Sequence, residues 1–104
     1  MTPVEQEVLS LLTEDYYGPW EIAVQVPVER GRIISAIENL LNGGLVEWFG
    51  RPDDSAAAVR LRQVGGIAPD LSDDAAWTAP SPNSPQLLLG ITDEGKRAYF
   101  DAGS

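Results

Sequence analysis

Apolar residues recur at helical spacing in three segments of the first half of the chain. The first helix is predicted for about residues 3–14, where one apolar stripe contains Val4, Val8, Leu11 and Leu12. A second, shorter helix is predicted for residues 20–26. Pro27 should end it, because proline disfavours helical backbone in the residue before it. A third is predicted for residues 29–42, with an apolar stripe formed by Ile33, Ile34, Ile37, Leu40 and Leu41.

The ends of these helices carry the residues that helix ends prefer. Thr2 can cap the first helix, Pro3 suits its first position, and Glu5 stands where a capping-box glutamate reaches back. Gly43 and Gly44 should end the third helix, since glycine accepts the left-handed backbone that closes a helix.

The second half of the chain predicts short strands instead. Residues 45–49 are rich in β-formers, and Trp48 and Phe49 should point to opposite faces of that strand. Residues 50–55 are typical of a turn, and the alternation in residues 59–62 predicts the returning strand of a hairpin. Residues 86–91 predict a last strand, and a final helix should begin at residues 92–94 and close at Gly103.

Residues 63–85 have the composition of a loop and are longer than the connections of compact domains usually are. We predict a loop-like insertion there, attached to the core by Ile67, Leu71 and Trp77. The chain of 104 residues is otherwise expected to form one domain of the α+β class, mainly α.

Composition excludes several classes of function. The sequence has no cysteine and no histidine, which removes disulfides, thiol nucleophiles, the commonest metal ligands and the usual catalytic triad. We therefore expect no enzyme, no catalytic residue, no metal and no cofactor. The sequence also has no run of apolar residues long enough to span a membrane, and its N-terminus lacks the features of a signal peptide, so a cytoplasmic protein is expected.

The second and third predicted helices are separated by only a few residues, which is the spacing of a helix-turn-helix, and the following hairpin would be a wing. The run from Ile22 to Ile33, with Gly44-Leu45-Val46 after it and Leu89-Gly90-Ile91-Thr92-Asp93-Glu94-Gly95-Lys96 beyond the hairpin, resembles winged helix-turn-helix regulators of the MarR and PadR kind. The resemblance implies a three-helix core, a small antiparallel sheet as the wing and a C-terminal helix. It also implies sequence-specific binding of double-stranded DNA as a transcriptional regulator. Glu29 departs from it, because the family prefers a serine cap there.

The polar face of the third helix is the candidate DNA-reading surface. At roughly 100° per residue, Arg32, Ser35, Asn39 and Asn42 fall opposite the apolar stripe. Arginine and asparagine can bind guanine and adenine edges in the major groove, and serine can bind either. Any exposed helix face is polar, however, so the same residues also fit a simple solvated surface.

The charge is distributed unevenly. The whole chain has a net charge of −9, whereas residues 30–62 carry five arginines and four carboxylates, a net charge of +1. In the DNA-binding hypothesis, phosphates would be held by Arg30 and by the wing arginines Arg51, Arg60 and Arg62. Arg60 and Arg62 would share one strand face, and a homodimer is expected because one acidic module should bind DNA weakly.

The alternative function is a winged-helix module that binds a protein and not DNA. Its acidic surface, the aromatic residues Tyr16, Tyr17, Trp20 and Trp48, or residues 63–85 would then meet the partner. The two hypotheses differ in what they require of the arginines. A continuous positive stripe from the third helix to the wing favours double-stranded DNA. Isolated arginines neutralised by Glu29, Glu38 and Glu47 favour a protein.

Overall fold

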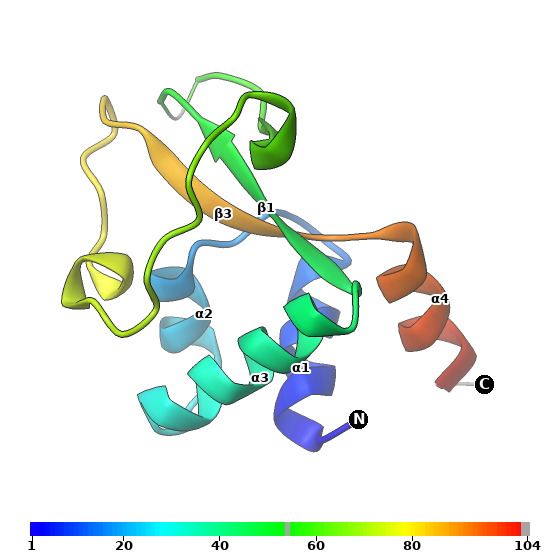
Figure 1. Ribbon diagram of the computed structural model, residues 1–104. Helices are drawn as coiled ribbons and strands as arrows, with labels where there is room; N and C mark the ends of the chain where they lie inside the picture. The colour runs from blue at the N-terminus through cyan, green and yellow to red at the C-terminus, as the bar shows by residue number, and fades with distance from the viewer. Residues whose placement is uncertain (54, 103–104) are drawn as a thin grey trace.

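The computed structural model describes residues 1–53 and 55–102, with only the backbone of Ala102. Within these ranges the chain forms an α+β domain, the predicted class (Figure 1). Its elements in chain order are α1 (Pro3–Leu12), α2 (Pro19–Gln25), α3 (Arg30–Asn42), β1 (Val46–Arg51), β2 (Val59–Arg60), the 3-10 helix η1 (Leu61–Gln63), the 3-10 helix η2 (Asp74–Trp77), β3 (Gln86–Ile91) and α4 (Asp93–Ala102). Gly103, the predicted end of the last helix, lies outside the described residues.

The predicted helix caps are present. The Thr2 hydroxyl accepts a hydrogen bond from the Glu5 backbone N–H and donates one to the Glu5 carboxylate at 2.8 Å. Gly44 has φ of 72°, and the backbone N–H groups of Gly44 and Leu45 donate to the carbonyls of Leu41 and Leu40. This pair of bonds is a Schellman motif, which ends α3 where the double glycine predicts.

α1 ends at Leu12, the last residue of its apolar stripe and two residues before the predicted end at about residue 14. The Thr13 hydroxyl donates to the Ser10 carbonyl at 2.6 Å, and the Glu14 N–H donates to the Leu11 carbonyl. These bonds tighten the last turn and direct the chain away from the helix axis.

The sheet has the strand order β2–β1–β3, and its main pairing joins strands that are far apart in the sequence. β1 pairs antiparallel with β3 over six residue pairs, from Val46–Ile91 to Arg51–Gln86, but with β2 over only two. The hairpin strand predicted for residues 59–62 is therefore wrong beyond Arg60, because Leu61 turns inward to start η1 and is buried. An isolated antiparallel bridge between Tyr17 and Leu89 adds the segment between α1 and α2 to the far edge of β3.

The core lies between the sheet and helices α1, α2 and α3, which gather on one side of β1 and β3 (Figure 1). The apolar stripe of α3 faces this core, with Ile33, Ile37 and Leu40 buried. Phe49 points to the other face of the sheet and packs on the Tyr16 ring, with 4.7 Å between ring centroids, while Trp48 packs against the core. The two neighbours therefore face opposite ways, as predicted.

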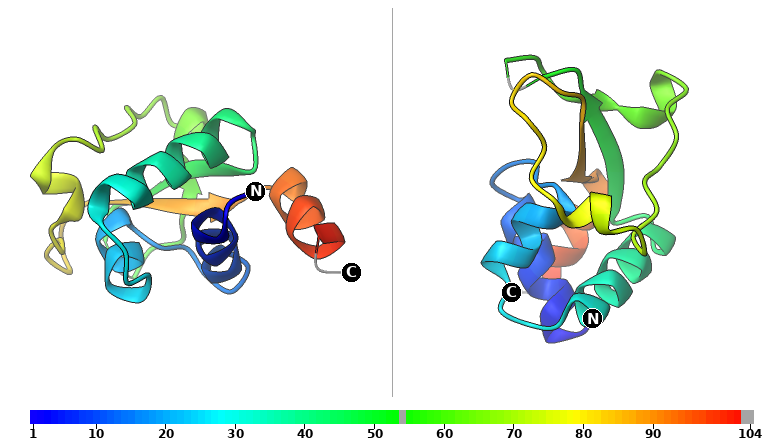
Figure 2. Two further views of the ribbon diagram at one scale, coloured as in Figure 1. Left: turned by 90° about the horizontal axis from the view of Figure 1, so that it is seen from below. Right: turned by 90° about the vertical axis from the view of Figure 1, so that its left-hand side faces the viewer.

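Residues 64–80, called the strap below, cross from η1 to α2 (Figures 1 and 2). Leu71 is buried in the main core, and the half-buried Trp77 donates its indole N–H to the Leu71 carbonyl at 2.8 Å. The predicted attachment is thus confirmed at Leu71 and Trp77. It is wrong at Ile67, whose side chain is 88% exposed after the turn that Gly65 makes with φ of 67°.

Candidate functional site

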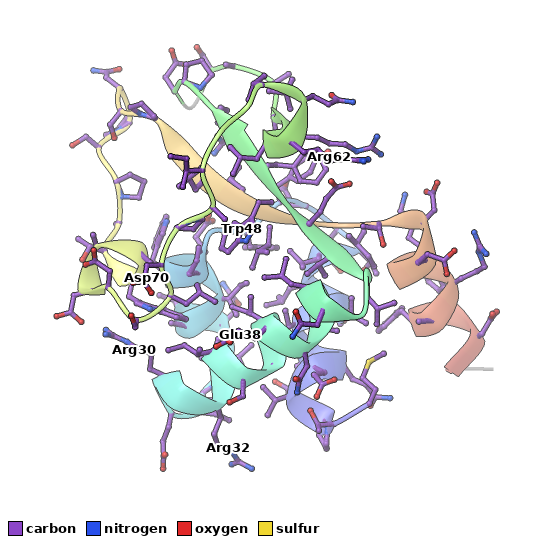
Figure 3. The ribbon with its side chains drawn as sticks, viewed as in Figure 1. Arg30, Arg32, Glu38, Trp48, Arg62 and Asp70 are labelled. Atoms are coloured by element: carbon purple, nitrogen blue, oxygen red, sulfur yellow. The ribbon has the colours of Figure 1, made fainter. Side chains whose placement is uncertain are left out.

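The outer face of α3 is uncovered. Arg32, Ser35, Asn39 and Asn42 are all exposed, opposite the buried Ile37. Arg32 points away from the body of the molecule in Figure 3 and has no ion-pair partner among the described residues. The helical spacing therefore predicted the exposure of this face correctly. Its arginine, serine and asparagine side chains are accessible to a ligand.

Arg30 lies on a different side of the same helix, where the strap meets it. Its Nη1 atom is 2.7 Å from Oδ1 of Asp74, and its Cζ atom is 5.3 Å from the centroid of the Trp77 ring. Both partners are more than forty residues away in sequence, so no local pattern could reveal them. The first arginine of α3 is therefore engaged by the chain itself.

Two of the arginines predicted for the wing, Arg60 and Arg62, share one carboxylate. Arg60 Nε is 3.0 Å from one oxygen of Glu47, and Arg62 Nε is 3.2 Å from the other. Arg62 belongs to η1 and not to a strand, so the predicted strand-face alternation is wrong for it, although both side chains still converge. Glu47, one of the three carboxylates expected to neutralise the arginines, stands at the centre of this group.

Arg51 is held at the opposite end of β1. Its Nε atom donates to the side-chain carbonyl of Gln86 at 2.7 Å, and Gln86 is the one buried polar residue among those described. The six-pair register of β1 and β3 places these two residues side by side. The sequence predicted a strand only to residue 49 and a turn at Arg51, which is wrong because β1 continues to Arg51 through its pairing with β3.

The labelled arginines do not lie together. In Figure 3, Arg30 and Arg32 are at one end of α3, and Arg62 is at the other side of the molecule, beyond Trp48 and Glu38. The described arginines Arg30, Arg60 and Arg62 are each within 3.2 Å of a carboxylate. Arg30 is thus paired one to one with Asp74, whereas Arg60 and Arg62 share the single carboxylate of Glu47 and keep one net positive charge.

A groove that was not predicted from the sequence runs between α3, β1 and the strap. It consists of two adjoining hollows of about 360 Å³ and about 310 Å³ that share Leu41, Trp48 and Ala68 as lining residues. We call this feature the strap groove. Ile34 and Glu38 line its first hollow, so one edge of α3 faces the groove while the Arg32 face lies beside it.

Among the described residues, no helix combines the length and the apolar character needed to cross a lipid bilayer. The chain was also compared with known proteins. No protein-family model matches it, and neither the curated proteins nor the solved structures contain a significant match.

Proposed function

We propose that this chain is a winged-helix domain whose function is to bind a partner protein. Three features support the winged-helix assignment. Only residues 26–29 separate α2 from α3, β1 and β3 follow as an antiparallel pair, and the Tyr17–Leu89 bridge adds the segment between α1 and α2 to the same sheet. This order of helices and strands, with a short helix-turn-helix connection, is typical of winged-helix domains.

The pairing of the arginines carries the choice of a protein over DNA. Exposed ion pairs contribute only about 0–1 kcal/mol each, so a phosphate could displace one of them. The carboxylate that had paired with the arginine would nevertheless stay beside the bound phosphate and repel it. Asp74 would then face the phosphate at Arg30, and Glu47 would face those at Arg60 and Arg62.

The net charge acts in the same direction. At −9, the chain repels a polyanion at long range, and binding to nucleic acid depends on cations that release counterions from phosphates. A protein partner with a basic surface would instead be attracted. The acidic surface therefore favours a basic protein over DNA.

Two selections with the intact chain test this proposal. A random-sequence selection of double-stranded DNA at low salt should give no enrichment. A selection of displayed random peptides of twelve residues should enrich a common sequence, and heat-unfolded protein should not retain it. Enriched DNA together with unenriched peptides would overturn the proposal.

DNA binding through α3 is the second candidate, and one observation favours it. The face with Arg32, Ser35 and Asn39 is fully open, as insertion into a major groove requires. Arg30, Arg51, Arg60 and Arg62 would hold phosphates, and the expected homodimer stays part of this candidate. With three to four phosphates neutralised per protomer, a plot of log affinity against log salt should have a slope of about −3 for a monomer and about twice that for the homodimer.

If DNA binding is found, Arg32→Ala should weaken specific binding by about 1–3 kcal/mol, because a base-reading arginine contributes that much discrimination. The measurement is fluorescence anisotropy with the selected duplex at moderate salt. Arg97→Ala, an exposed arginine on α4 that pairs with Glu94 at 3.3 Å, is the matched control and should change affinity much less. Equal effects of the two substitutions would mean that α3 does not read the bases.

A further inference from the structure

The strap groove has an apolar floor that nothing in the described chain covers completely. Ile34, Leu41 and Trp48 line it and are only half-buried, although each packs against the core on its other side. On the strap beside the groove, Val64 is 61% exposed and Ile67 is 88% exposed. Apolar surface gathered around a groove, and not scattered singly, is typical of an interaction site.

The open form of the hollows suits the side chains of an extended segment. Pockets for drug-sized molecules have volumes of about 300–1,000 Å³ and enclose most of the ligand. Hollows of about 360 Å³ and about 310 Å³ are at the lower end of that range, and both open to solvent along the strap. Two adjoining hollows of this kind can accept successive apolar side chains of a peptide.

The charges at the edge of the groove are unbalanced. Glu38 and Asp70 line the first hollow, both are exposed, and neither has an ion-pair partner among the described residues. The Ser72 hydroxyl donates to Asp70 at 2.6 Å and the Ser72 backbone N–H also donates to it, and these bonds lower the pKa of Asp70, so it stays ionised.

The second hollow differs, because its carboxylate is already neutralised. Glu47 lines that hollow together with Arg62, and it binds both Arg60 and Arg62. The groove is therefore negative at the end formed by α3 and the strap, whereas Arg60, Arg62 and Glu47 together leave one net positive charge at the end formed by β1 and η1. An occupant should match that polarity.

We propose that the strap groove binds a segment of a partner protein in which apolar side chains stand next to lysine or arginine. The apolar side chains fill the hollows over Leu41 and Trp48, and the cations meet Glu38 and Asp70. This inference rests on the proposed protein-binding function and specifies its site and the chemistry of the partner. Charge complementarity selects a basic segment over a second copy of this chain, whose net charge of −9 would oppose self-association.

The first test uses a fluorescein-labelled peptide of twelve residues in which leucine and lysine alternate. Its affinity for the intact protein is measured by anisotropy and compared with that of a serine–lysine peptide and a leucine–glutamate peptide. Glu38→Arg should lower the affinity for the leucine–lysine peptide by about fivefold or more, since it reverses a charge that contacts the peptide. Glu7→Arg, at an exposed position on α1 outside the groove, makes the same net change in charge and should weaken binding by less than about twofold.

The second test fills the groove without changing the charge. Ala68 is exposed and lines both hollows, so Ala68→Trp should block them and reduce affinity for the leucine–lysine peptide at least fivefold. Ala57→Trp adds the same side chain at an exposed position outside the groove and should leave affinity unchanged. Circular dichroism of both variants serves as the control and should show that the fold is kept.

The outcomes separate this inference from the function on which it rests. Equal weakening by Glu38→Arg and Glu7→Arg, or no effect of Ala68→Trp, overturns the groove as the site. Peptides enriched by selection that bind equally well to Ala68→Trp overturn the groove but keep the protein-binding function. A protein that self-associates in sedimentation, and that Ala68→Trp makes monomeric, would show a second copy in the groove and overturn the assignment to a basic partner.

Discussion

Replacing Gly95 by alanine should lower the free energy of unfolding by about 3 kcal/mol, because the added methyl group overpacks a rigid junction. Gly95 is buried in the first turn of α4, where a Cβ atom would collide with the Leu45 carbonyl oxygen and lie 2.7 Å from Cγ1 of Ile91. The Leu45 oxygen cannot easily move away, since it accepts a hydrogen bond from the Thr92 backbone N–H at 3.0 Å.

The expected sign is the opposite of what helix propensity alone predicts. Alanine usually stabilises a helix interior relative to glycine by roughly 0.5–1 kcal/mol. Gly31→Ala supplies the matched control, because a Cβ atom at Gly31 in α3 would meet nothing within 4 Å. Urea unfolding followed by circular dichroism should show Gly31→Ala as neutral or stabilising. A similar result for Gly95→Ala would contradict the close packing of α4 against the start of β1.

The parts of the fold that could be predicted from sequence are those fixed by neighbouring residues. Thr2 and Glu5 define the start of α1, and the double glycine defines the end of α3, because caps act within one turn. The apolar stripe of α3 could be assigned to the core from its spacing alone. Local chemistry was sufficient in each case.

The pairing of the strands could not be predicted in the same way. β1 and β2 are close in sequence and were expected to form the main hairpin, yet β3 provides the six-residue partner. Hydrophobic alternation indicates that a segment is a strand but does not indicate which strand lies beside it. Leu61 shows the same limit, because burying its side chain below Gly50 ends the alternation that predicted a longer β2.

Some features of the candidate site follow from local helix geometry, and others depend on tertiary contacts. The exposure of Arg32, Ser35 and Asn39 follows from angles on one helix, and the structure places all three on the open face. The partners of the arginines follow from tertiary contacts, such as Arg30 with Asp74 and Arg62 with Glu47. Net charge indicated that such partners would be abundant, but only the fold determines which arginines they neutralise. The preference for a protein over DNA depends on that second kind of information.

The other large effect is expected at Ile37, whose side chain is fully buried at the centre of α3. Ile37→Ala should reduce the free energy of unfolding by about 2–5 kcal/mol, because it removes buried methyl groups and leaves a cavity between the helices and the sheet. For a domain of this size, each kcal/mol should lower the melting temperature by about 4–8 °C, which scanning calorimetry can measure.

Asn39→Ala, two residues further along the same helix, is the matched control for Ile37→Ala. Both proposed functions require that the polar face of α3 is exposed, and this variant tests that exposure. Asn39 is exposed, so its truncation should change stability by no more than about 0.5 kcal/mol. A loss comparable to that of Ile37→Ala would mean that the polar face of α3 is packed inside the molecule, and no ligand could then reach it. With the two effects well separated, a defect in DNA binding caused by Asn39→Ala would reflect contact with the duplex and not unfolding. Unchanged peptide binding by the same variant would show that the peptide does not depend on Asn39, as binding in the strap groove requires.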